Sequence, residues 1–77
     1  MEIRYSKQAI KFLEKQEESI RMRIKYAIMK LPSGDVKKLV GQPYYRLRVG
    51  DFRVLFTRDG QIIHISKIDS RGQIYKA

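Results

Sequence analysis

The segment from Tyr45 to Phe56 restricts the fold of this chain more than any other, because it has the pattern of a β-hairpin with two different faces. Apolar and basic residues alternate on either side of Gly50-Asp51, a pair that suits a two-residue hairpin loop. This loop predicts the register Val49 with Phe52, Arg48 with Arg53, Leu47 with Val54 and Arg46 with Leu55. One face then carries the apolar side chains Tyr45, Leu47, Val49, Phe52, Val54 and Phe56. The opposite face carries the arginines Arg46, Arg48 and Arg53.

The arginine side of this hairpin has a chemical consequence. In the predicted register Arg48 and Arg53 lie directly opposite each other, and like charges in that position destabilise a sheet by about 0.2–1 kcal/mol. The apolar side needs a core to cover it. We therefore expect the rest of the chain to pack on the apolar side, and an anion to bind on the arginine side.

Length and composition predict one small domain that covers residues 1–77. A chain of this size buries only about 60% of the surface that its unfolded form exposes, but a hydrophobic content of 43% supports a core. The absence of cysteine excludes disulfides and thiolate metal sites. No apolar stretch approaches the roughly 18 residues of a membrane span, and Met1 leads into amphipathic sequence rather than a signal peptide. We expect a cytoplasmic protein with no membrane partner.

The positive charge of the chain is large and unevenly placed. The formal net charge is +9 and the pI is near 10.1. Residues 36–77 contain nine Lys and Arg against three Asp, so this half carries +6 and holds most of the excess. A basic domain of this kind binds nucleic acid, an anionic membrane or an acidic protein, and charge alone does not distinguish these partners.

The N-terminal half predicts a strand followed by helices. Residues 1–5 alternate loosely as a first strand, and Ser6 is a suitable N-cap for a helix. Apolar residues then recur at helical spacing as far as Leu31. The stretch from Glu14 to Ser19 has no apolar residue, which favours two antiparallel helices broken near Gln16, although the spacing also fits one continuous helix.

The C-terminal half predicts strands. Pro32 and Gly34 end the helical pattern, and a basic connector leads to the first hairpin. Asp59-Gly60 is expected to turn the chain into a strand over residues 61–68, with Phe56 beside Ile63, Val54 beside Ile65, Leu55 beside His64 and Arg53 beside Ser66. The predicted fold class is α+β in the order β-α-α-β-β-β, with an antiparallel, hairpin-rich sheet and a two-helix hairpin on one face.

Several kinds of active site find no support in the residues. His64 is the only histidine, and no Cys, Asp or Glu accompanies it at ligand spacing, so no metal site is predicted. Neither a Ser-His-Asp set nor a Cys-His set can be assembled. Gly50 and Gly60 are isolated turn glycines rather than parts of a phosphate-binding loop, and no cofactor is expected.

What remains is the arginine side of the hairpin together with the C-terminal segment. Arg46, Arg48, Arg53 and Arg71 can converge on a phosphate, and Tyr75 can stack on a base or orient a hydroxyl. The alternative is a solvated basic surface with Tyr75 packed on the sheet edge.

The chain resembles the RelE/ParE toxin superfamily, and specifically its RelE-like branch of messenger-RNA interferases. The resemblance rests on four segments in order, residues 6–13 (SKQAIKFL), 31–39 (LPSGDVKKL), 45–53 (YRLRVGDFR) and 68–75 (IDSRGQIY). It implies a toxin of a type II toxin-antitoxin system whose sheet cradles messenger RNA in the ribosome. Such a toxin is an endoribonuclease that turns the ribose 2′-hydroxyl onto the adjacent phosphate.

The resemblance also implies roles for individual residues. Arg46 and Arg48 match paired basic residues on the first hairpin strand, Arg53 matches the basic residue that opens the next strand, and Arg71 matches the one after the last long strand. On physical grounds we expect Arg53 and Arg71 to stabilise charge that builds on the phosphate, and Arg46 and Arg48 to hold the RNA backbone and the leaving oxygen. Tyr75 matches an aromatic that stacks on RNA, which makes Arg46, Arg48, Arg53, Arg71 and Tyr75 the expected catalytic set. The expected RNA-binding residues are Lys37, Lys38, Arg46, Arg48 and Tyr75. The paired positions are lysines in the prototype, and arginine stays protonated, so the general base is not identified.

The expected partners are the ribosome, messenger RNA and a cognate antitoxin that is acidic and partly disordered. The toxin alone is expected to be a monomer. One alternative is a ParE-type inhibitor, which shares the fold but binds DNA gyrase without catalysing a reaction. Another is a relative that binds RNA without cleaving it, which would show salt-dependent RNA affinity and no cleavage.

Overall fold

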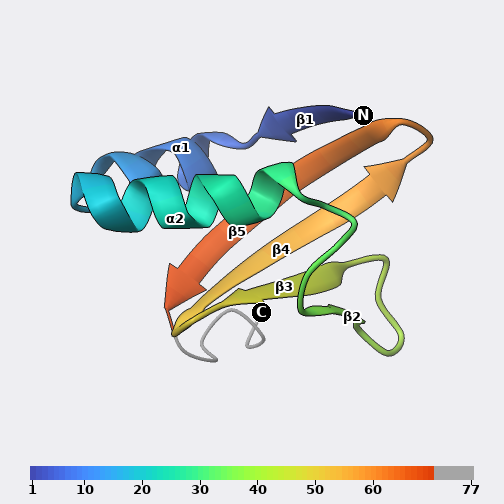
Figure 1. Ribbon diagram of the computed structural model, residues 1–77. Helices are drawn as coiled ribbons and strands as arrows, with labels where there is room; N and C mark the ends of the chain where they lie inside the picture. The colour runs from blue at the N-terminus through green and yellow to red at the C-terminus, as the bar shows by residue number, and fades with distance from the viewer. Residues whose placement is uncertain (71–77) are drawn as a thin grey trace.

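The computed structural model describes residues 1–70, which form two helices and one mixed sheet. The elements follow the order β1 (Glu2–Tyr5), α1 (Lys7–Glu14), α2 (Glu18–Met29), β2 (Val36–Lys38), β3 (Tyr45–Val49), β4 (Phe52–Asp59) and β5 (Ile62–Ser70). The strand order is β1-β5-β4-β3-β2, with β1 parallel to β5 and the other neighbours antiparallel. Both helices lie on the same face of the sheet (Figure 1). The α+β class and the two-helix layer are confirmed.

The helical half breaks where the sequence loses its apolar residues. The Ser6 hydroxyl accepts a hydrogen bond from the Ala9 amide at 3.1 Å, as an N-cap should. The helix ends at Glu14 and a second begins at Glu18, which confirms two helices rather than one. Folding back lets both helices bury apolar side chains on the sheet, whereas one continuous helix would extend beyond so small a sheet.

The core lies between the helices and the sheet. Its buried residues come from both layers: Ala9, Leu13, Ile24, Ile28, Leu31, Leu47, Val49, Val54, Phe56, Ile63, Ile65 and Ile68. Ile24, Ile28 and Val54 have no exposed surface at all. Tyr45 stacks on Phe56 with 5.3 Å between the ring centroids, and the Phe12 ring meets Phe52 edge to face. The apolar side of the predicted hairpin is therefore the side that faces the helices.

The first hairpin has the predicted register. Val49 pairs with Phe52 and Arg48 with Arg53, so Gly50 and Asp51 form the loop. Gly50 has a φ of 59°, in the left-handed region that glycine reaches without a steric penalty. Its position as the first loop residue agrees with a common type of two-residue hairpin turn.

The second hairpin has a different register from the predicted one. Asp59 pairs with Ile62, so the loop consists of Gly60 and Gln61 instead of Asp59 and Gly60. Gly60 has a φ of 60°, and a glycine thus holds the first loop position in both hairpins. Phe56 pairs with Ile65 rather than Ile63. Between Asp59 and Phe56 this shift of two residues keeps each side chain on its predicted face but moves it along the strand.

A β-bulge shifts the register once more along β5. Phe56 pairs with Ile65, but Leu55 pairs with Lys67, so Ser66 is the extra residue. Because of this extra residue, Ile65 and Ile68 both face the core although they are three positions apart. Arg53 consequently pairs with Asp69, and the predicted pairing of Arg53 with Ser66 is wrong.

The start of α1 binds the β5 backbone at and just after the bulge, where β1 no longer pairs with it. The Ser6 hydroxyl donates to the Ser66 carbonyl at 2.8 Å. The Gln8 side-chain amide donates to the Ile68 carbonyl at 2.9 Å and accepts from the Ile68 amide at 3.0 Å. These bonds satisfy main-chain groups beyond the last paired residue of β1, Tyr5, and they fix α1 against β5.

The segment expected to be a connector contains a further strand. Val36, Lys37 and Lys38 pair with Leu47, Arg46 and Tyr45, which makes β2 the edge strand beside β3. The element order is therefore β-α-α-β-β-β-β. In the part of the chain from residue 1 to 70, no helix has the length and apolar character needed to cross a membrane.

Candidate nucleic-acid interface

Three arginines project from the sheet face opposite the helices. Arg46 and Arg48 alternate along β3 with core residues, and Arg53 lies across from Arg48 on β4. This placement follows from the two-residue period of a strand, since Leu47, Val49 and Val54 face the helices. The structure thus brings together the three hairpin arginines that the sequence predicts to lie together. We refer to this side of the sheet as the arginine face.

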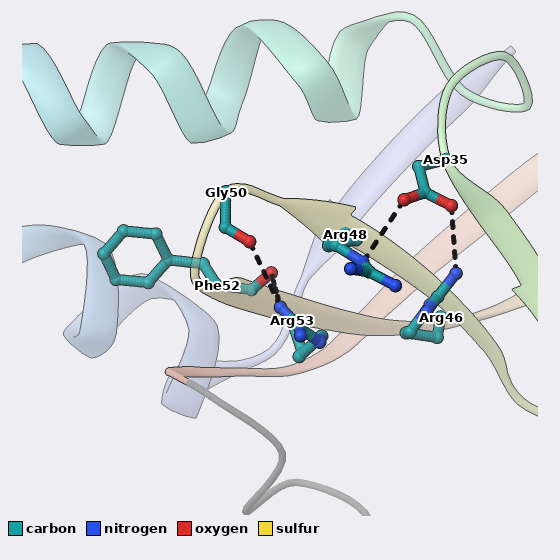
Figure 2. A network of polar contacts seen from close by, with 6 residues as sticks. All are labelled: Asp35, Arg46, Arg48, Gly50, Phe52 and Arg53. Atoms are coloured by element: carbon teal, nitrogen blue, oxygen red, sulfur yellow. Dashed lines mark hydrogen bonds and ion pairs between the residues drawn. The ribbon is translucent and has the colours of Figure 1, made fainter.

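Arg46 and Arg48 share a single carboxylate, that of Asp35 (Figure 2). The Nη2 atom of Arg46 lies 3.0 Å from one oxygen of Asp35, and the Nε atom of Arg48 lies 3.3 Å from the other. The Asp35 carbonyl also accepts a hydrogen bond from the Arg48 amide at 3.0 Å. Asp35 immediately precedes β2, so the pairing of β2 with β3 holds its carboxylate beside both arginines.

The two arginines differ in their exposure to solvent. Arg46 is only 9% exposed, and its Nε atom is buried without a hydrogen-bond partner. The Arg48 side chain is 48% exposed and the Asp35 side chain 56%. Arg48 is therefore the member of this pair that a large ligand can reach directly, while Arg46 lies beneath the surface.

Arg53 has no such carboxylate partner among residues 1–70. Its Nη1 donates to the carbonyls of Gly50 and Phe52, each at 3.2 Å, which holds the side chain toward the hairpin turn (Figure 2). Asp69 lies across from Arg53 on β5, and the Asp69 carboxylate accepts from the amide of Ser70 at 2.8 Å. The guanidinium of Arg53 is half-buried, with further donors available.

Lys37 and Lys38 lie on opposite sides of the edge strand. Lys37 pairs with Arg46 and belongs to the arginine face. Lys38 pairs with Tyr45, and its Nζ lies 5.5 Å from the centre of the Tyr45 ring and donates to the Gln42 carbonyl. A surface hollow of about 330 Å³ at this edge is lined by Lys37, Lys38, Leu39, Val40 and Arg46.

The far end of the arginine face holds groups remote from Arg53. His64 pairs with Thr57 and not with Leu55 as predicted, which places it four residues from Arg53 along the strands, about 13 Å away. Arg4, the parallel partner of His64, binds Glu2 and lowers the pKa of that carboxyl through the hydrogen bond and its positive charge. Neither group reaches the arginine cluster.

Two of the predicted site residues, Arg71 and Tyr75, lie outside the described residues. The described strand β5 ends at Ser70, two residues beyond the predicted end of the strand. In residues 1–70, no three His, Cys, Asp or Glu side chains gather as ligands of a metal ion would.

The sequence does not indicate two carboxylates of this region: Asp35, which pairs with Arg46 and Arg48, and Asp69, which lies across from Arg53. The role of Asp35 is not visible in the sequence because β2 has only three residues, a length at which a strand has the pattern of a connector. The position of Asp69 opposite Arg53 is not visible in the sequence because it depends on the bulge. One signal could have indicated an edge strand that begins after Asp35. A short segment with an apolar residue and two basic residues directly follows the residues that end the helix, and the arginine-bearing hairpin comes next.

Two comparisons with known proteins indicate the same superfamily. The model of a family described as the ParE toxin of the type II toxin-antitoxin system parDE matches residues 3–75. A chain of the RelB-RelE antitoxin-toxin complex from Methanococcus jannaschii is 30% identical, with a TM-score of 0.75 and 94% of each chain covered. The comparison with curated protein sequences gave no match.

Other solved structures have the same fold at lower identity. A chain of the archaeal RelE-RelB complex from Pyrococcus horikoshii OT3 is 27% identical, with a TM-score of 0.72 and coverage of 94% of this chain and 96% of that one. A chain of the intact RelBE toxin-antitoxin complex from E. coli is 18% identical, with a TM-score of 0.71 and coverage of 92% and 95%, which is a likeness of fold alone. With a family model that spans nearly all of the sequence and a similar RelE complex, the chain belongs to the RelE/ParE superfamily of toxins from type II toxin-antitoxin systems.

Proposed function

We propose that this toxin is a ribosome-dependent endoribonuclease that cleaves messenger RNA and so inhibits translation. The observation that carries the proposal is the cluster of Arg46, Arg48 and Arg53 on the sheet face that the helices leave uncovered. A ligand with regularly spaced negative charges, such as the backbone of RNA, complements a surface of this kind. Because the substrate would be messenger RNA under translation, the proposed place of action is the cytoplasm.

In the proposed reaction, the ribose 2′-hydroxyl gives its proton to water and its oxygen forms a bond to the adjacent phosphorus. The bond from phosphorus to the 5′-oxygen breaks, and the 5′-oxygen takes up a proton from water, which leaves a 2′,3′-cyclic phosphate. Negative charge builds on the phosphate oxygens in the transition state, and fixed cationic donors stabilise it. Arg53 and Arg71 are the proposed donors to those oxygens. Arg48 and Arg46 would hold the neighbouring backbone, with Arg46 acting from beneath the surface, and Tyr75 would stack on a base.

The proposed chemistry assigns no proton acceptor to an arginine. A guanidinium remains protonated at any physiological pH, so it cannot take the proton of the 2′-hydroxyl. His64 lies too far along the strands from Arg53 to serve the same phosphate. Positioning of the substrate by the ribosome would then supply a large part of the acceleration, because alignment of the 2′-oxygen with the phosphorus is itself a strong catalytic effect.

The proposed partners are the ribosome, messenger RNA and a cognate antitoxin. Similar structures are RelB-RelE antitoxin-toxin complexes, which supports an antitoxin partner for this chain. The proposed antitoxin is acidic and partly disordered, because the toxin carries a net charge of +9 and an extended acidic segment would cover a basic surface. Without antitoxin, we propose a monomer.

A second candidate function is inhibition of DNA gyrase without catalysis. The match to a ParE family model is the observation that favours it. The arginine face favours the nuclease, because binding to gyrase through protein contacts does not call for a cluster of phosphate-binding side chains.

Primer extension on messenger RNA that is translated in the presence of the purified protein would test the proposal. We expect breaks inside codons that appear only with ribosomes, and a rate about 10²–10³ lower in Arg53→Ala and in Arg71→Ala, by analogy with the loss of one charge-stabilising donor. Arg58→Ala is the matched control for Arg53→Ala, since Arg58 lies on the same strand, is exposed and has no part in the proposed site. Intact RNA together with loss of plasmid supercoiling by gyrase would favour the second candidate.

A further inference from the structure

Asp35 joins Arg46 and Arg48 on the arginine face, although its charge is negative like that of the proposed ligand (Figure 2). Its two carboxylate oxygens bind two different arginines, Arg46 at 3.0 Å and Arg48 at 3.3 Å. A carboxylate beside a phosphate-binding surface weakens the attraction for RNA through its charge. Asp35 must therefore contribute to the site in some way other than attraction of the RNA.

The contacts of Asp35 restrict how both guanidinium groups can lie. Arg46 and Arg48 are on the same side of β3, two residues apart, and half-exposed Arg48 would sample many rotamers as a free side chain. One carboxylate that binds both reduces this freedom and offsets the repulsion between the two cations. The ion pair with Arg48 involves its Nε atom, which leaves the terminal nitrogens of a half-exposed guanidinium for other acceptors.

The backbone fixes Asp35 in turn. Its carbonyl accepts from the Arg48 amide at 3.0 Å, and the next residue begins the pairing of β2 with β3. The carboxylate is therefore attached to the same strand pair as the arginines that it binds. This is the arrangement by which a supporting residue holds a ligand-binding side chain in a fixed orientation.

We propose that Asp35 is a positioning residue that holds Arg46 and Arg48 in the orientation in which they receive the RNA backbone during cleavage. The proposal rests on the proposed nuclease function. It predicts opposite effects on two quantities: the loss of the Asp35 charge does not weaken RNA binding, because the surface becomes more positive, but it slows cleavage, because the guanidinium groups are no longer held.

The test compares Asp35→Asn with Glu14→Gln. Both substitutions remove one negative charge with little change in size, and Glu14 is exposed at the end of α1 in the helical layer, away from the arginine face. Single-turnover cleavage is measured on ribosomes programmed with a fluorescent messenger RNA, and the dissociation constant is measured with the same RNA carrying a 2′-deoxy nucleotide at the cleavage position. Circular dichroism establishes the folded fraction of each variant at the assay temperature.

We expect Asp35→Asn to bind the deoxy RNA at least as tightly as Glu14→Gln but to cleave about 10- to 100-fold more slowly per folded molecule, the effect of a small misplacement of catalytic groups. Asp35→Glu, which keeps the carboxylate, should recover part of the rate. Equal rates for Asp35→Asn and Glu14→Gln would overturn the proposal. So would a loss of rate that the folded fraction accounts for entirely.

A measurement that does not depend on cleavage separates this proposal from the proposed function. The Nε–Hε resonance of Arg48 in ¹⁵N NMR spectra reports its contact with Asp35 directly. We expect this resonance to shift and to exchange with solvent faster in Asp35→Asn than in Glu14→Gln. If the wild-type protein binds RNA without cleaving it, the nuclease function fails, and an Arg48 resonance unchanged by Asp35→Asn would show separately that Asp35 does not hold the arginine.

Discussion

Loss of Asp35 and loss of Arg46 should have unequal effects on the stability of the fold, because only one partner of this ion pair is buried. Arg46 is 9% exposed, whereas the Asp35 side chain is 56% exposed. The alanine substitution Asp35→Ala leaves a buried cation without its counter-charge, next to an Nε atom that already has no partner. The substitution Arg46→Met leaves only an exposed carboxylate, which water and Arg48 still satisfy.

The expected magnitudes follow from this difference in burial. A buried donor that loses its partner costs about 1–3 kcal/mol, so we expect Asp35→Ala to lower the free energy of unfolding by about 2 kcal/mol. A drop of that size lowers Tm by about 8–16 °C in a domain of this length. We expect Arg46→Met to stay within about 1 kcal/mol of the wild type or to be more stable, because an apolar side chain of similar volume avoids the cost of burying a charge.

Urea unfolding followed by circular dichroism measures these differences, and the double variant tests the reasoning. Once Met replaces Arg46, no buried cation remains beside Asp35, so Asp35→Ala should then cost less than about 0.5 kcal/mol, which is within the error of additivity. If Arg46→Met is as destabilising as Asp35→Ala, or if the two effects add, the stranded charge is not the cause. If Arg46→Met folds as expected, its rate in the RNA cleavage assay measures the contribution of Arg46 to the proposed reaction without a loss of stability.

Three further predictions concern the fold and its charges. Gly50→Ala and Gly60→Ala should each destabilise the protein by about 1–2 kcal/mol in urea unfolding, since both glycines have φ near 60°. The two costs should agree within about 0.5 kcal/mol, because only the flexible end of the Arg23 side chain approaches Gly50. A much larger cost at Gly50 would mean that the Arg23 side chain cannot move away from the added methyl group. Gln8→Ala should cost about 1–3 kcal/mol, because it removes both hydrogen bonds to the bulged strand, and an unchanged midpoint would contradict that role. The pKa of Glu2 should lie below its ordinary 4.5 in an NMR titration and return toward that value in Arg4→Gln. Because the pKa is lowered in the folded state, the contact of Glu2 with Arg4 contributes to stability above pH 4.5, and this contribution disappears as pH falls through the folded-state pKa.

Local patterns in the sequence were sufficient to predict most of the fold. The first hairpin, the Ser6 cap and the break between the helices depend on residues close to one another in the chain, and all of them are confirmed. The two faces of the hairpin follow from strict alternation. Because the three predicted arginines depend only on this alternation, their common face could be predicted as well.

What the sequence did not predict depends on contacts between distant segments. The bulge at Ser66 is stabilised by Ser6 and Gln8, which are 60 residues away in the chain, so no pattern within β5 indicates it. The strand β2 is too short to show alternation and exists because β3 offers it a partner. The errors about the neighbours of Arg53 therefore have one cause: the register of β4 with β5 is decided by the core and by α1, and not by the turn sequence alone.

These corrections change how charge is distributed on the arginine face. The opposition of Arg48 and Arg53 led us to expect an external anion, but the protein itself supplies one for Arg48 and Arg46, in the form of Asp35. Arg53 receives only backbone carbonyls and has no carboxylate within ion-pair distance in the part of the chain that the structure describes. Of the three arginines, Arg53 thus has the positive charge that is least compensated within the protein. A phosphate gains most beside an uncompensated guanidinium, and it gains least beside one that must first share its donors with a carboxylate. We therefore propose that Arg53 binds the reacting phosphate and that Arg46 and Arg48, held by Asp35, orient the neighbouring backbone.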